Sequence, residues 1–272
     1  MQRKKLFLAA LLLTAAVTGC KKKETIDLST LHTAAETQTQ EQETDKSAEG
    51  ETLDLSDSEK ESPADGSHTG NKYSVSTSME TYSENGISIQ YPVLSKFADE
   101  ELGKQINEKI KSNAIAIVKA KGLPKEGSTL NVTATVESSN LKRLVLSYKG
   151  ELKTAEGSER IFYSDTIDLE TGKNLRLSDY ADAYTIAGYL ASGDYSFAEA
   201  PKGDEAAVRA YINEDGHDTN YYYKKLSDAD FSNSEAYPEY FSFERQGIIF
   251  VSVPVSHELG DYALIKYSPD NK

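Results

Sequence analysis

The stretch LNVTATVESSNLKRLVLSY, residues 130–148, decides the fold. Apolar residues alternate with polar ones on both sides of a turn at 138–140: Leu130, Val132, Ala134 and Val136 before it, and Leu144, Leu146 and Tyr148 after it. Alternation with a period of two is typical of strands that bury one face. We therefore predict two antiparallel strands joined by the turn, with one face on a core.

A third strand and a long helix extend this unit. The third strand is predicted from Ile161, Tyr163, Ile167 and Leu169, with Ser164, Thr166 and Asp168 on its polar face. Between residues 99 and 121 apolar residues recur every three to five positions, which predicts one amphipathic helix ended by Gly122 and Pro124. A strand at 87–91, ended by Pro92, precedes the helix. We expect an antiparallel meander with one face covered by the helix.

The second half of the chain mixes both kinds of element. Leu177-Ser178-Asp179 is typical of a helix entrance, and 182–191 and 204–225 are candidate helices. A hairpin is predicted from 240–243 and 248–255 around 245–247, followed by a last strand at 262–267. The predicted class is α+β: an antiparallel sheet packed by a long amphipathic helix, then a helix-rich segment, a closing hairpin and a strand.

The amino terminus has the pattern of an exported lipoprotein. Arg3, Lys4 and Lys5 precede an apolar run that ends at Val17, and Thr18-Gly19-Cys20 follows. A basic start, a short apolar segment and small residues before a cut site predict a secretory signal, residues 1–19. The cysteine resembles the lipidated cysteine of a bacterial lipobox. We therefore expect acyl chains on Cys20 to hold the protein on the extracytoplasmic face of the cell membrane.

Residues 20–72 differ in composition from the rest of the chain. They contain no aromatic residue, while all 17 tyrosines lie from Tyr73 onward. Acidic, polar stretches that lack apolar residues cannot offset the entropy of ordering, so we predict a disordered acidic linker. The folded domain is then 73–272, divisible into 73–170 and 171–272.

The charge and cysteine content exclude some functions. The net charge of −14 disfavours nucleic acid as a partner, because phosphate backbones are repelled. Cys20 is the single cysteine, so no intramolecular disulfide can form. An acidic surface favours basic partners or cations, although it also serves solubility alone.

Several short motifs resemble the RsiV-like extracytoplasmic domains. They are the turn at 168–173 (DLETGK), Leu177-Ser178-Asp179-Tyr180, and the strand Gly247-Ile248-Ile249-Phe250, and the resemblance covers about residues 82–268. Such domains occur in lysozyme-sensing anti-sigma factors, before some peptidoglycan deacetylase domains, and alone on lipoproteins. The resemblance implies a binding domain, for peptidoglycan or for a basic exported protein such as lysozyme.

Two segments depart from that family. Relatives often carry a glycine-rich loop with a histidine before the third strand, whereas residues 154–160 here are TAEGSER. Relatives also tend to have a tyrosine-rich segment where Val253-Pro254-Val255-Ser256-His257 stands in this chain. A ligand that relatives recognise through the histidine loop is therefore not implied for this protein.

Catalytic and metal sites have little support in the sequence. The folded part contains only His217 and His257, and neither lies in a nucleophile motif, so we predict no catalytic residues. The segment 213–218 (NEDGHD) fits a calcium loop poorly, because tyrosines occupy its first and last ligand positions. We expect a solvated loop there, with no metal and no cofactor.

Tyrosines provide the strongest binding candidates. Tyrosine has a flat apolar face and a polar tip, which suit glycan or protein contact. The candidates cluster late in the chain: Tyr221, Tyr222, Tyr223, Tyr237 and Tyr240. Helix-end packing is the alternative explanation for the cluster. We expect a non-catalytic binding domain, the alternatives being an assembly partner of another envelope protein or a cell-wall hydrolase.

Overall fold

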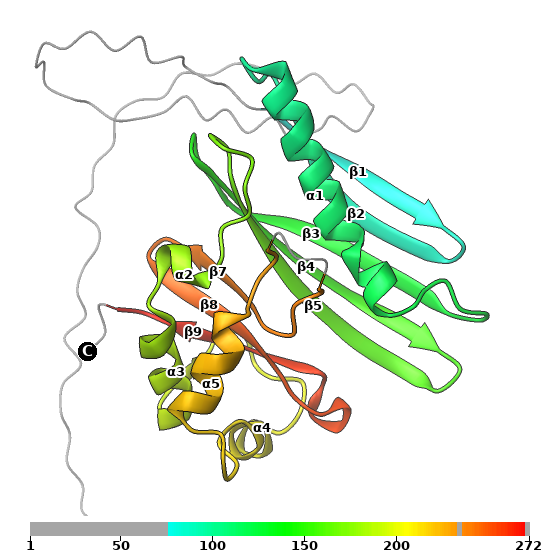
Figure 1. Ribbon diagram of the computed structural model, residues 1–272. Coiled ribbons are helices and arrows are strands. Elements are labelled where there is room, and N and C mark those ends of the chain that lie inside the picture. The colour runs from blue at the N-terminus through cyan, green and yellow to red at the C-terminus, as the bar shows by residue number, and fades with distance from the viewer. Residues whose placement is uncertain (1–75, 233–235, 270–272) are drawn as a thin grey trace, which may run out of the picture. The chain divides into compact units, whose positions relative to one another are not determined.

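The structure, a computed structural model, describes residues 76–232 and 236–269. The predictions for the signal segment, Cys20 and the acidic linker lie outside the described residues. Within the described ranges the chain forms two sheets, of five and four strands, together with helices, which confirms the α+β class (Figure 1). No helix in these ranges is long and apolar enough to cross a membrane.

The first sheet contains the predicted meander. Its strands follow the order of the chain: β1 (Ser76–Glu84), β2 (Ile87–Ser95), β3 (Thr129–Ser139), β4 (Arg143–Thr154) and β5 (Gly157–Asp168). Neighbours are antiparallel except β2 and β3, which run parallel where Ile87–Ile89 faces Leu130–Val132. A parallel pair needs a crossover, and helix α1 (Glu100–Ala120) supplies it.

Strand β2 does not end at Pro92, as we predicted, but continues to Ser95. Beyond Ile89 its only strand partner among the described residues is β1, so its other edge is open to α1. On that edge the backbone of Leu94 exchanges two hydrogen bonds of 2.8 Å with the side chain of Asn107. The backbone nitrogens of residues two apart in a strand point to the same edge. The nitrogen of Pro92 therefore points toward α1, like that of Leu94, and the missing N–H of proline removes no hydrogen bond to β1.

Helix α1 matches the predicted range closely. Asp99 caps its amino end by accepting hydrogen bonds of 3.0 Å from the backbone N–H groups of Glu101 and Leu102. Its buried face lies on the sheet, and the Tyr163 hydroxyl of β5 donates to the Ala114 carbonyl at 2.6 Å. The apolar spacing of the sequence therefore places α1 correctly.

Strand β5 departs from the prediction of one polar, open face. Ser164, Asp165 and Thr166 are all buried, as are the apolar residues around them. The second sheet covers the face that the sequence marks as polar, since the Ser164 hydroxyl donates to the Ser242 carbonyl at 2.9 Å. Burial on both faces follows from this contact between distant parts of the chain.

The second sheet has the strand order β6-β9-β8-β7 and includes the predicted hairpin and last strand. The hairpin turn contains Gln246 and Gly247, both with positive φ, as a two-residue turn of the primed type requires. Side chains of β8 alternate between two cores: Phe250 joins the core of the first sheet, and Val251 joins the core under the helices. The strands are β6 (Ser196–Phe197), β7 (Phe241–Arg245), β8 (Ile248–Pro254) and β9 (Tyr262–Tyr267).

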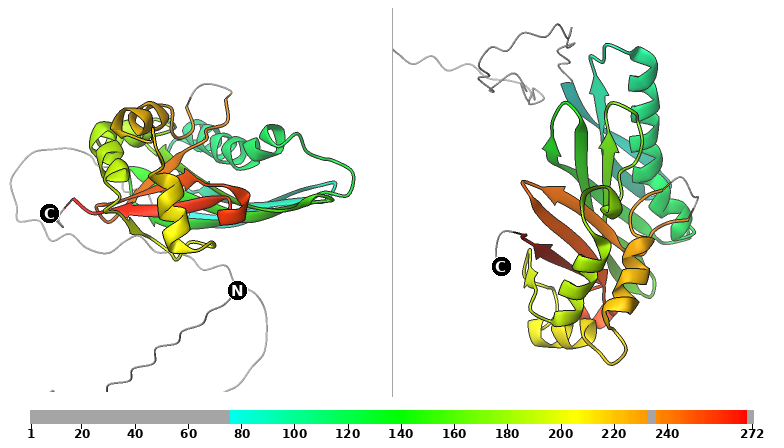
Figure 2. Two further views of the ribbon diagram at one scale, coloured as in Figure 1. Left: turned by 90° about the horizontal axis from the view of Figure 1, so that it is seen from below. Right: turned by 60° about the vertical axis from the view of Figure 1, so that its left-hand side comes forward.

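Four helices accompany this sheet: α2 (Leu177–Tyr180), α3 (Ala183–Ser192), α4 (Glu205–Ile212) and α5 (Thr219–Ser227). Figures 1 and 2 show α3 and α5 side by side, and their buried residues share one core with β8 and β9. The prediction of a single helix at 204–225 was wrong, because two helices occupy this range. The range is interrupted at 213–218, where Gly216 has a φ of 94° and Asp218 caps the start of α5.

Candidate functional site

A groove of about 1260 Å³ follows helix α1. One wall is the helix itself, with Gln105, Lys109 and Ser112 among its polar side chains. Tyr82 of β1 and Tyr237 add aromatic rings to the lining. The remaining lining residues are Glu108, Asn113, Ile115, Ala116, Val118, Lys119, Ala120, Leu123, Gly172, Phe231, Ser232 and Ala236. Aromatic rings together with amide, hydroxyl and charged groups give a mixed surface suited to a polar ligand.

The amide of Asn113 connects this groove to the buried interior. Asn113 is 7% exposed, and its Nδ2 lies 3.0 Å from both Asp165 Oδ2 and Asn174 Oδ1. Both N–H groups of the amide therefore have acceptors. The carboxamide oxygen has no hydrogen-bond partner among the described residues.

Asp165 is a carboxyl group held out of water. It is 3% exposed, and burial raises its pKa to about 7, with a further rise from the negative charge of Asp230. The amide of Asn113 and the positive charge of Lys109 act in the opposite direction. Its Oδ1 has no hydrogen-bond partner among the described residues. Asp165 can therefore exchange a proton near neutral pH.

Asp230 is the second buried carboxyl group of this region. It accepts hydrogen bonds from the backbone of Leu177 at 2.8 Å and from the backbone and hydroxyl of Ser242, both at 2.5 Å. Burial raises its pKa to about 7 despite these donors. Asp230 thus ties the start of α2 to β7, which is a structural task.

Asp165 and Asn113 were not among the predicted site residues, although both stand out in the sequence. Asp165 stands between Tyr163 and Ile167 in the alternation of β5, on the apolar face of that strand. Asn113 follows Ile110 by three positions on the buried stripe of α1. A polar residue at a core position of an otherwise regular pattern indicates a buried interaction or a site.

The five candidate tyrosines do not form one surface. Tyr237 lines the groove, while Tyr221, Tyr222 and Tyr240 line a second pocket of about 200 Å³ beside α5. Tyr222 and Tyr240 are buried, and the Tyr222 hydroxyl donates to the Ile212 carbonyl. Tyr223 is 45% exposed and lies in neither pocket.

The second pocket also contains His217. Its ring stacks on Tyr221 with 4.1 Å between centroids, and its Nε2 lies 3.2 Å from Glu214. Its Nδ1 lies 3.2 Å from the Ile212 carbonyl, so both ring nitrogens have partners. The loop residues around it pack this histidine, and no serine, threonine or cysteine accompanies it in the pocket lining.

The other histidine of the described residues, His257, is exposed and pairs with Asp261 at 2.7 Å. This pairing raises the pKa of the imidazole above its ordinary value. In the described ranges no group of three or more histidine, cysteine, aspartate or glutamate side chains could hold a metal ion.

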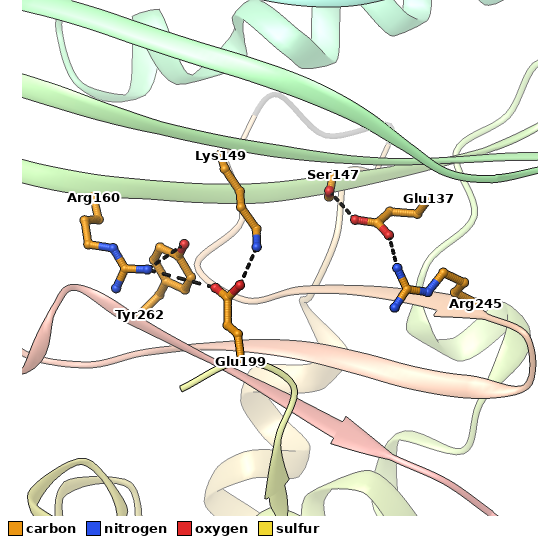
Figure 3. A network of polar contacts seen from close by, with 7 residues as sticks. All are labelled: Glu137, Ser147, Lys149, Arg160, Glu199, Arg245 and Tyr262. Carbon is orange, nitrogen blue, oxygen red and sulfur yellow. Dashed lines mark hydrogen bonds and ion pairs between the residues drawn. The ribbon is translucent and has the colours of Figure 1, made fainter. Parts of the chain in front are cut away.

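Charged side chains also gather where the two sheets meet, and Figure 3 shows them pointing toward one another. Glu199 accepts from Lys149 at 2.6 Å and lies 4.0 Å from Arg160, which also donates to the Tyr262 hydroxyl at 2.9 Å. Nearby, Glu137 lies 2.5 Å from Arg245. Each of these charged groups has a partner of opposite sign, although three cations face two carboxylates, so the network joins the sheets rather than forming an open ligand site.

Comparisons with known proteins give structural neighbours but no sequence family. No protein-family model matches the chain, and no curated protein matches it. The structure is similar to a DUF3298 family protein from Pseudomonas aeruginosa PAO1, with a TM-score of 0.36 and 12% identity over 72% of this chain and 90% of that chain. A DUF3298 family member from Bacteroides fragilis NCTC 9343 gives a TM-score of 0.38 and 9% identity over 72% and 89%.

Proposed function

We propose that this chain is a lipoprotein anchored through Cys20 on the extracytoplasmic face of the membrane, whose domain binds a cell-wall glycan without cleaving it. The signal pattern at 1–20 and the acidic linker support the location, because they would leave the domain tethered close to the wall. The resemblance of its motifs to RsiV-like domains supports a binding role.

The groove along α1 is the observation that carries the proposed ligand. Its volume of about 1260 Å³ exceeds the space that a single sugar needs, so it suits several units of a chain. Tyr82 and Tyr237 offer apolar ring surface, while Gln105 and Ser112 offer hydrogen bonds to hydroxyl and acetamido groups. Glycan strands of the wall present this combination of apolar ring faces and polar edges.

Co-sedimentation with purified peptidoglycan tests this proposal. The full chain in detergent should sediment with sacculi, and Tyr82→Ala should lower the bound fraction severalfold. Tyr223→Ala is the matched control, because this exposed tyrosine lies outside the groove. Equal binding by the two variants would move the site away from α1, and release of soluble sugar fragments would show a hydrolase instead.

A second candidate function is capture of a basic exported protein, such as a lysozyme. In the part from α2 to β9 acidic side chains outnumber basic ones, and Glu214, Asp215 and Asp218 are exposed on one loop. Attraction between opposite charges weakens as salt screens it. Retention on immobilised lysozyme that disappears between 50 mM and 500 mM salt would favour this candidate. Docking on another envelope protein remains the third alternative, and crosslinking in cells would detect it.

A further inference from the structure

We infer that Asn113 orients the ligand in the α1 groove: its carboxamide oxygen accepts a hydrogen bond from an N–H or O–H group of the glycan, and the ionised Asp165 behind it holds the amide in that orientation. This inference rests on the proposed function and names the group that the site recognises. It assigns a ligand-contacting role to Asn113 and a positioning role to Asp165.

The hydrogen bonds of Asn113 fix the direction of its amide. Each of its two N–H groups has an acceptor at 3.0 Å, the buried Asp165 Oδ2 and the partly buried Asn174 Oδ1. The oxygen is the remaining polar atom of a residue that lines the groove, and it has no partner among the described residues. A carbonyl oxygen can only accept, so the matching ligand group is a donor.

The charge state of Asp165 decides whether this orientation persists. An ionised carboxylate only accepts, so it requires the N–H side of the amide. A protonated carboxyl can donate to the amide oxygen, and it then favours the reversed amide, which would place N–H groups in the groove. A ligand that donates to Asn113 therefore binds the ionised form and drives a proton from Asp165.

Other ionisable groups around Asp165 come from each element packed on it. Lys109 on α1 favours the charged carboxylate, and Asp230 disfavours it. Tyr148 on β4 and Tyr163 on β5 are buried with raised pKa values, so both stay neutral near pH 7. Asp165 and Asp230 are thus the buried groups that can titrate close to neutrality.

Calorimetric titration with a soluble tetramer of N-acetylglucosamine tests the inference. The full chain in detergent is titrated at pH 6, 7 and 8 in two buffers of different ionisation enthalpy, which gives the number of protons released. We expect release of up to about half a proton at pH 7, because a carboxyl group with a pKa of about 7 is already half ionised there, and of nearly one proton at pH 6. The affinity should fall about tenfold per pH unit well below pH 7. Asn113→Ala should weaken binding about tenfold at pH 8.

Variants of the two buried carboxyl groups separate the outcomes. Asp165→Asn should bind with no proton release and a flat pH profile, whereas Asp230→Asn, which does not contact Asn113, should keep the release. Binding without proton release by the wild-type chain, or equal release by Asp165→Asn, would overturn this inference while leaving glycan binding intact. Binding of neither the tetramer nor sacculi would instead refute the proposed function. The wild-type proton count decides the question even if a variant does not fold.

Discussion

At the scale of single residues, two stacked tyrosines allow a direct comparison of buried hydroxyl groups. Tyr148 and Tyr163 are both fully buried and lie face to face, with 4.5 Å between ring centroids. The Tyr163 hydroxyl donates to Ala114, whereas the Tyr148 hydroxyl has no partner among the described residues. Tyr163→Phe should therefore lower the free energy of unfolding by about 1 kcal/mol.

The matched change, Tyr148→Phe, removes a hydroxyl that is buried without a hydrogen bond. Such a group costs free energy, so its loss should leave stability unchanged within about 0.5 kcal/mol or raise it. Urea denaturation of both variants measures the difference. If Tyr148→Phe lowers the free energy of unfolding as much as Tyr163→Phe does, the Tyr148 hydroxyl has a hydrogen-bond partner.

The buried carboxyl groups make stability depend on pH in an uncommon direction. The pKa of Asp165 is about 7 in the folded chain, against 3.8 as its ordinary value. The folded state therefore holds the proton more tightly, and this contribution is complete below about pH 4 and is lost as the pH rises to about 7. Asp165→Asn should gain stability relative to wild type between pH 5 and pH 8, by on the order of 2 kcal/mol.

The control for this prediction is Glu170→Gln, which changes an exposed acid in the turn after β5. Its free energy of unfolding should differ from that of wild type by the same amount at every pH measured. Chemical denaturation at pH 5, 6, 7 and 8 gives the comparison. A constant difference for Asp165→Asn would mean that the carboxyl is already ionised throughout this range.

At the scale of helices and strands, aspartate caps recur. Asp99, Asp182, Asp204 and Asp218 each accept a hydrogen bond from the first turn of α1, α3, α4 and α5. Asp218→Ala should lower the free energy of unfolding by about 1 kcal/mol, because the Tyr221 N–H loses its acceptor at 2.8 Å. Asp215 lies in the same exposed loop but caps no helix, so Asp215→Ala should change the free energy of unfolding by less than about 0.5 kcal/mol. Thermal unfolding measures both, and equal effects would argue against capping.

Elements with a regular apolar pattern could be predicted from the sequence, and others could not. Helix α1 and the meander carry long, unambiguous periods, and the last strand occupies the predicted residues 262–267. Strand β1 was missed because its residues are mostly exposed on both faces and show no alternation. The helix predicted at 204–225 was too long, because its apolar spacing hides the interruption at 213–218.

At the scale of the whole molecule, the contact between the two sheets was beyond the reach of local patterns. Ser164 and Ser242 meet although 78 positions separate them, and the local pattern assigned Ser164 to a polar face. The α1 groove depends on the same long-range assembly, because Phe231 and Tyr237 join the core of the first sheet from the second half of the chain. The sequence shows that Asp165 is a polar residue at a core position of β5, but it does not show which residues contact it.

The ion pairs between the sheets should therefore contribute to folding as one unit. Glu137 of β3 contacts Arg245 of β7 at 2.5 Å and also accepts from Ser147, and its side chain is only 11% exposed. A double-mutant cycle with Glu137→Gln and Arg245→Gln should give a coupling energy of about 1–1.5 kcal/mol, because Glu137 is shielded from water although 43% of the Arg245 side chain is exposed. The exposed pair Glu151 and Lys153, within β4, should give less than about 1 kcal/mol. Equal coupling in the two cycles would mean that this ion pair adds no more than an exposed pair does, and that other contacts hold the two sheets together, such as Phe162 packed against Phe243 and Tyr262.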